Sequence, residues 1–82
     1  MMPNVGLEFL LKQEFKSAGV PDIYSKRIHE RIYIEYDLRD DFTTLVRFEE
    51  IEKYGIDRVK ITIPRKIKTK QDLLNLLNIL QG

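Results

Sequence analysis

The stretch "RIYIEYDLRDDFTTLVRF" (Arg31–Phe48) decides the fold, because it joins two strand-like segments through a short polar turn. Its first half has an apolar residue at every second position, the period of a strand with one buried face: Ile32, Ile34, Tyr36 and Leu38. Its second half is rich in β-branched and aromatic residues, which favour strands. "RDD" (Arg39–Asp41) suits a three-residue hairpin loop. The stretch therefore predicts two antiparallel strands.

A three-residue loop also predicts how the two strands pair. It sets Leu38 opposite Phe42, Tyr36 opposite Thr44, Ile34 opposite Val46 and Ile32 opposite Phe48, and these pairs form the expected buried face. The other face would carry Tyr33 together with charged residues: Arg47, Arg58, Lys60, Glu35 and Glu49. A platform on which nucleic-acid bases stack needs several aromatic residues, and this face has one. We therefore expect cross-strand ion pairing there.

A helix over Phe42–Tyr54, ended by Gly55, is the competing interpretation of the second strand. Its apolar residues would scatter around the helix axis instead of forming a stripe. The strand is therefore favoured, although "EEIEKYG" (Glu49–Gly55) by itself suits a short helical turn.

Further elements flank the hairpin on both sides. Upstream, the apolar spacing predicts a helix over Val5–Ala18, with Asn4 as its N-cap and Gly19 in the left-handed position beyond its end. Pro21–Glu30 suits either a short helix or an extended lead into the first strand. Downstream, "RVKITIP" (Arg58–Pro64) alternates apolar and polar residues and ends in proline, which predicts a third strand.

The C-terminal segment predicts a second helix. Thr69 suits its N-cap, and Asp72 stands where a capping box places an acidic residue. Leucines at helical spacing form its apolar seam, which two neighbours widen: Leu73, Leu76, Leu77 and Leu80, with Leu74 and Ile79. We expect one α+β domain over residues 1–82, in the order α-β-β-β-α. A three-stranded antiparallel sheet would carry the N-terminal and C-terminal helices on one face.

The composition excludes several classes of site. The 82 residues include no cysteine, so disulfides, thiolate metal sites and cysteine nucleophiles are excluded. No apolar run approaches the ~18 residues of a membrane span, and the N-terminus lacks the basic start of a signal peptide. We therefore expect a cytoplasmic protein with no membrane contact and no cofactor.

Two groups of residues are candidates for chemistry. His29 is the only histidine, and no Ser-His-Asp order, Cys-His pair or histidine-rich spacing accompanies it. Four carboxylates near the hairpin turn suit a hard cation such as Mg²⁺: Glu35, Asp37, Asp40 and Asp41. Strand alternation separates them, and aspartate is also common in turns for its own hydrogen bonding. We therefore predict no catalytic residue and no metal site.

The stretch "IPRKIKTKQD" (Ile63–Asp72) lies within a strongly basic segment. From Arg58 to Gln71 there is no acidic residue, whereas the whole chain has 14 Lys and Arg against 13 Asp and Glu. The basic residues are Arg65, Lys66, Lys68 and Lys70, with Lys60 and Arg58 in support. Phosphates bind helix N-termini, and cations beside them add affinity by releasing counterions. The alternative is a solvated loop that keeps the neighbouring strand from aggregating.

The order α-β-β-β-α, with basic residues where the second helix starts, resembles the double-stranded-RNA-binding fold. The stretch "ITIPRK" (Ile61–Lys66) is also similar to a strand end of HicA-type toxin ribonucleases, which are built on a similar plan. The first resemblance implies that lysines at this place grip phosphates. The second would place His29, ten residues after Gly19, near a catalytic histidine, although "KRIH" stands where that family has Gly-Ser-His.

We therefore expect a small non-enzymatic module that binds the phosphate backbone of RNA or DNA. The alternative is a protein-interaction or homodimeric module, of the kind found in viruses and mobile elements, that uses a sheet edge or the last helix. A ribonuclease that depends on His29 is a third reading.

Overall fold

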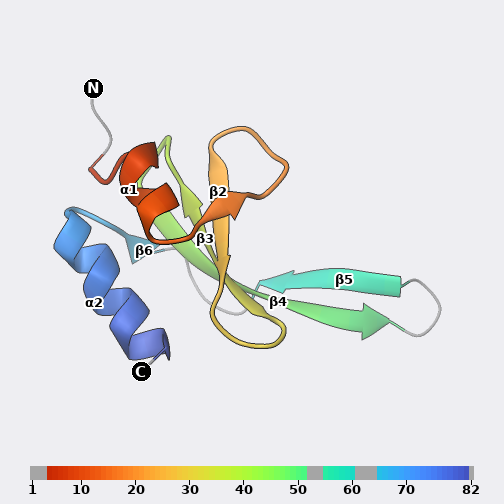
Figure 1. Cartoon of the computed structure of the whole chain (residues 1–82). Coiled ribbons are helices and arrows are strands. Elements are labelled where there is room, and N and C mark those ends of the chain that lie inside the picture. The colour runs from red at the N-terminus through yellow and green to blue at the C-terminus, as the bar shows by residue number, and fades with distance from the viewer. Residues whose placement is uncertain (1–3, 52–54, 61–64, 82) are drawn as a thin grey trace.

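The computed structural model describes residues 4–51, 55–60 and 65–81 and forms an antiparallel sheet with two helices (Figure 1). Its elements are α1 (Leu7–Lys12), β1 (Lys16–Ser17), β2 (Ile23–Arg27), β3 (Ile32–Asp37), β4 (Phe42–Ile51), β5 (Gly55–Lys60), β6 (Arg65–Lys66) and α2 (Lys70–Gln81). The strand order is β1-β2-β3-β4-β5, and β6 also pairs with β4. The α+β class and the antiparallel sheet are confirmed, but the expectation of three strands was wrong.

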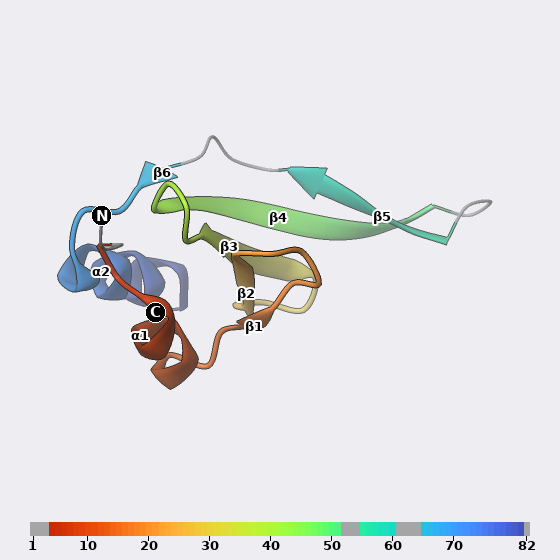
Figure 2. The ribbon, with the colours of Figure 1, turned by 90° about the horizontal axis from the view of Figure 1, so that it is seen from above.

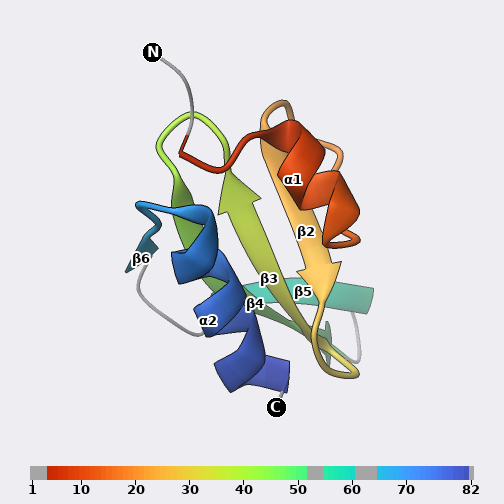
Figure 3. The ribbon, with the colours of Figure 1, turned by 60° about the vertical axis from the view of Figure 1, so that its left-hand side comes forward.

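Both helices lie on the same side of the sheet (Figures 2 and 3). Leu10 of α1 and Leu73 of α2 are fully buried in one cluster with Ile34 and Tyr36 of β3. Beyond this body, β4 continues as a two-stranded ribbon with β5 alone, because β3 pairs with β4 only through residues 42–47. The helices therefore cover one face of the sheet and leave the other, which we call the open face, without a helix.

The hairpin between β3 and β4 is present, but its register differs by one residue from the prediction. Tyr36 pairs with Thr43 and Asp37 with Phe42, so the loop has four residues, 38–41, instead of three. The fourth loop residue is Asp41, which has φ 55° and whose N–H donates to the Asp37 carbonyl at 2.8 Å. Because side chains alternate along a strand, one extra loop residue moves every β4 side chain to the opposite face.

The N-terminal helix is shorter than predicted. It ends at Lys12, and Glu14 then takes the left-handed conformation (φ 69°), which ends the helix. Phe15 turns back so that its N–H donates to the Leu10 carbonyl and its side chain is buried. Gly19 has the predicted positive φ, 85°, but it serves the turn between β1 and β2. Asn4 is no N-cap, because its side chain donates to the Ile67 carbonyl at 2.9 Å.

The middle of the chain forms strands where the sequence allowed either a helix or an extended segment. Pro21–Glu30 contains β2, so the extended alternative is confirmed there. The chain over Phe42–Ile51 is strand throughout, so the competing helix and the helical turn at residues 49–51 were wrong. The third predicted strand is observed from Gly55 to Lys60, and its expected end at residues 61–64 lies outside the described part.

The second helix begins and is capped as predicted. The Asp72 N–H donates to the Thr69 hydroxyl at 3.1 Å, and the Asp72 carboxylate accepts from the Thr69 N–H at 3.2 Å. Leu73 and Leu77 are buried, whereas Ile79 is 77% exposed. The expected seam is therefore real, but Ile79 does not widen it.

A buried hydrogen bond joins β3 to the hairpin loop. The Tyr36 side chain is fully buried, and its hydroxyl donates to Asp41 Oδ1 at 2.7 Å. Burial, followed by this hydrogen bond to Asp41, raises the pKa of Tyr36 above its ordinary range. The folded state therefore holds the proton of Tyr36 more tightly than the unfolded chain does.

Stability should consequently fall at alkaline pH. Above about pH 10 the unfolded chain loses the Tyr36 proton and the folded protein keeps it, so unfolding becomes easier by about 1.4 kcal/mol per pH unit. Urea unfolding between about pH 9 and 11 measures this slope. Tyr36→Phe removes the titrating group and should flatten the curve, whereas parallel curves for the two proteins would contradict the assignment.

Candidate nucleic-acid interface

The basic segment, residues 65–70, begins as an edge strand and continues into the second helix. β6 pairs with the start of β4, with Lys66 opposite Phe42 and Arg65 opposite Thr43. The Thr43 hydroxyl donates to the Arg65 carbonyl at 3.2 Å, and the Ile67 N–H donates to the Asp41 carbonyl at 2.7 Å. Ile67 is buried. The backbone of this segment is therefore held firmly against the body.

The cations of the segment face solvent. Arg65, Lys66, Lys68 and Lys70 are all exposed. Within the described residues, no carboxylate forms an ion pair with any of the four. Lys70 differs from the others because its ammonium lies 5.5 Å from the centre of the Phe9 ring, a cation–π contact that links α2 to α1. Arg65, Lys66 and Lys68 are therefore the cations available to a partner.

The N-terminus of α2 already has an anion. Besides capping Thr69, the Asp72 carboxylate accepts the Lys68 N–H at 3.1 Å. These amides would otherwise attract a phosphate. A phosphate bound at this segment would consequently contact the basic side chains. Phosphate binding by the backbone N–H groups at the start of α2, which the sequence suggested, is disfavoured.

The register places the cations on both faces of the sheet. Directly opposite residues of an antiparallel pair share a face, so Lys66 lies on the face of Phe42, and alternation along β4 extends this face to Phe48. By the same register, Arg58 is opposite Phe48 and Lys60 is opposite Val46. The side chains of Arg58 and Lys60 lie outside the described part of the structure.

The open face differs from the expected one in its aromatic content. Tyr33 is opposite Val46, so Tyr33, Val46 and Phe48 share this face, whereas Arg47 lies opposite Ile32 on the other. The rings of Tyr33 and Phe48 meet edge to face, with centroids 5.2 Å apart and planes at 88°. The predicted three-residue loop had placed Phe48 on the opposite face. The observed four-residue loop is what brings Phe48 to the face of Tyr33.

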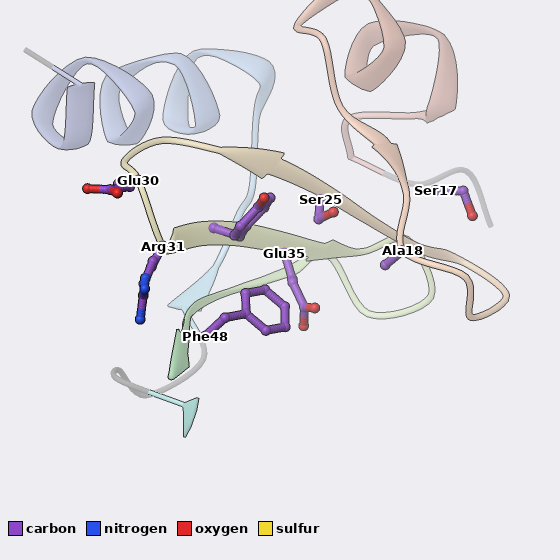
Figure 4. A pocket seen from close by; sticks show the side chains of 8 residues that line it. Ser17, Ala18, Ser25, Glu30, Arg31, Glu35 and Phe48 are labelled. Carbon is purple, nitrogen blue, oxygen red and sulfur yellow. The ribbon is translucent and has the colours of Figure 1, made fainter. Parts of the chain in front are cut away.

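A hollow of about 550 Å³ lies beside this aromatic pair (Figure 4). Its lining residues come from four neighbouring strands, the turn after β1 and the loop before β3: Ser17, Ala18, Ser25, Glu30, Arg31, Tyr33, Glu35 and Phe48. Figure 4 shows Glu35 and Phe48 pointing to the side of the sheet away from the helices. The volume is within the range of small-ligand pockets.

The other predicted candidates are not brought together. His29 is exposed in the loop between β2 and β3, and the described lining of the hollow does not include it. Asp37 pairs with Arg39 at 3.0 Å, and the hydrogen bond from the Arg39 side chain lowers the pKa of Asp37. The Asp41 carboxylate accepts the hydrogen bond from the buried Tyr36 hydroxyl. Within residues 4–51, 55–60 and 65–81, no group of three metal-binding side chains is found.

No helix in the described ranges is both long enough and apolar enough to cross a membrane. Comparison of the chain with protein-family models, with curated proteins and with solved structures gives no match in any of the three. The site is therefore interpreted from its own chemistry.

Proposed function

We propose that the protein is a small non-enzymatic module that binds the phosphate backbone of nucleic acid through Arg65, Lys66 and Lys68. One observation carries the proposal: these cations are exposed and, within the described residues, have no carboxylate partner. Cations that only balanced the protein's own acids would be expected in ion pairs. Lys70, Lys60 and Arg58 extend the same segment and would support the contact.

The setting of these cations favours binding physically. Each phosphate that they neutralise releases condensed counterions, which supplies affinity that depends on salt and little on sequence. Because Ile67 is buried and its N–H and carbonyl are both hydrogen-bonded, the backbone between Lys66 and Lys68 loses little freedom on binding. Backbone contacts position a nucleic acid without reading its sequence.

The test is a pair of charge reversals, Lys66→Glu with Lys68→Glu. We expect the double variant to bind a labelled single strand about ten-fold or more weakly at low salt, because two phosphate contacts are lost. The slope of log affinity against log salt should become shallower by about 1.4. Fluorescence anisotropy at about 50 and 200 mM salt, with single-stranded and duplex RNA and DNA, measures both quantities.

Lys12→Glu with Arg47→Glu is the matched control. It changes the net charge equally, at exposed positions on α1 and on the face of β4 opposite the open face. Its effect should be much smaller. An equal loss in both double variants would mean that only net charge matters, and no binding by the wild type at low salt would end the proposal.

A homodimeric or protein-interaction module is the second candidate. It is favoured by apolar side chains that the helices leave exposed, Ile79 at 77% and Leu11 at 54%. Light scattering over a wide range of protein concentration tests it. A mass that rises to twice that of the 9.8-kDa chain, and falls back in Ile79→Ser, would support this candidate.

A further inference from the structure

We infer that the open face binds unpaired bases of a single-stranded nucleic acid, with Tyr33 and Phe48 as the stacking residues. The inference rests on the proposed backbone contact and narrows its ligand to single strands. Three observations carry it: the geometry of the two rings, the hollow beside them, and the position of Lys66 on the same face.

The two rings remain able to stack. In an edge-to-face pair, the ring that presents its edge keeps both faces clear of its partner, and the other ring keeps one. Tyr33 and Phe48 meet in this way at 88°, and both side chains are only partly buried. A base could therefore lie against either ring without separating the pair.

The hollow supplies polar groups beside the rings. Ser25 lies on β2, next to the strand of Tyr33, and its hydroxyl both donates and accepts hydrogen bonds. Arg31 and Glu35 line the same hollow and already have interactions within the protein. An apolar ring flanked by a few polar groups suits a flat heteroaromatic ligand with hydrogen-bonding edges, which is the chemistry of a nucleobase.

The same strand connects the hollow to the basic segment. Lys66 pairs with Phe42, and Phe48 is six residues further along β4 on the same face. At about 3.3 Å per residue the separation is roughly 20 Å. One short strand could therefore place phosphates at Lys66 and bases at Phe48. A duplex hides the faces of its bases, so this combination selects single strands.

Oligonucleotides of equal length and charge, with and without bases, test the inference. We expect the wild type to bind the base-bearing strand about ten-fold more tightly than the abasic strand. Phe48→Leu, and separately Tyr33→Leu, should lower the affinity for the base-bearing strand about five-fold or more and leave the abasic strand unchanged. The same measurements with RNA and with DNA oligonucleotides show which of the two nucleic acids the open face prefers.

Phe42→Leu is the matched control. It removes a ring that is 38% exposed on the same face but outside the hollow, and it should change neither affinity. NMR of the wild type, in which the ring signals of Tyr33 and Phe48 should shift with the base-bearing strand alone, covers the case that a variant fails to fold.

The outcomes separate the two proposals. Equal affinity for abasic and base-bearing strands, or unmoved ring signals, would overturn base binding and leave the backbone contact standing. Tighter binding of duplex than of single strand would do the same. Absence of binding to every oligonucleotide at low salt would overturn both proposals, and binding of a protein partner at this face instead would replace them.

Discussion

Asp41→Ala is expected to lower the free energy of unfolding by about 3 kcal/mol, a large share of the stability of a small domain. Asp41 Oδ1 accepts the Tyr36 hydroxyl at 2.7 Å and the Asn4 N–H at 3.1 Å. Alanine would leave the Tyr36 hydroxyl buried without a partner, which costs about 1–3 kcal/mol by itself. It would also occupy a left-handed backbone position, φ 55°, that aspartate tolerates better.

Asp41→Asn is the conservative comparison for this loop. Asparagine keeps an Oδ1 acceptor and tolerates the left-handed conformation, so its cost should be about 1 kcal/mol or less. Urea unfolding at neutral pH measures both variants. An alanine variant as stable as the wild type would show that the four-residue loop does not depend on this side chain.

Leu73→Ala should be similarly destabilising, by about 3 kcal/mol. Leu73 is fully buried between α2 and the sheet, in one cluster with Ile34 and Tyr36, so truncation loses apolar contact and leaves a cavity. Ile79 provides the contrast within the same helix, because it is 77% exposed. Ile79→Ala should change the free energy of unfolding by about 0.5 kcal/mol or less.

Thermal and urea unfolding of the two variants, under identical conditions, give the comparison. The expected result is a clear difference between two apolar residues that helical spacing alone places in one seam. Equal destabilisation by both changes would mean that Ile79 is buried in solution, for example by a second copy of the chain. That result would favour the homodimeric candidate.

Much of the fold was predictable because its signals are local. A capping box depends on two side chains three residues apart, and strand alternation depends on every second residue, so α2 and β3 were predicted correctly. The end of α1 was not, because Glu14 carries no stop signal of its own. Its left-handed conformation lets Phe15 reach a core that is built from distant segments.

Part of the candidate site was likewise predictable from local signals, and part of it was not. The exposure of Arg65, Lys66 and Lys68 was predictable from their charge, because charged side chains favour solvent in any part of a fold. The face on which Phe48 lies did not follow from its identity. It depends on whether the hairpin loop has three residues or four, and each length suits the local sequence.

By itself, the sequence determined the α+β class, the antiparallel hairpin, the capped last helix and a basic segment at its start. These depend on periodicity, capping and charge, which act over a few neighbouring residues. Only the tertiary structure decided the register, since Asp41 occupies the fourth loop position through bonds to Tyr36 and Asn4. That one-residue difference moved Phe48 beside Tyr33 and gave the open face its aromatic pair, because side chains on a strand alternate strictly between two faces.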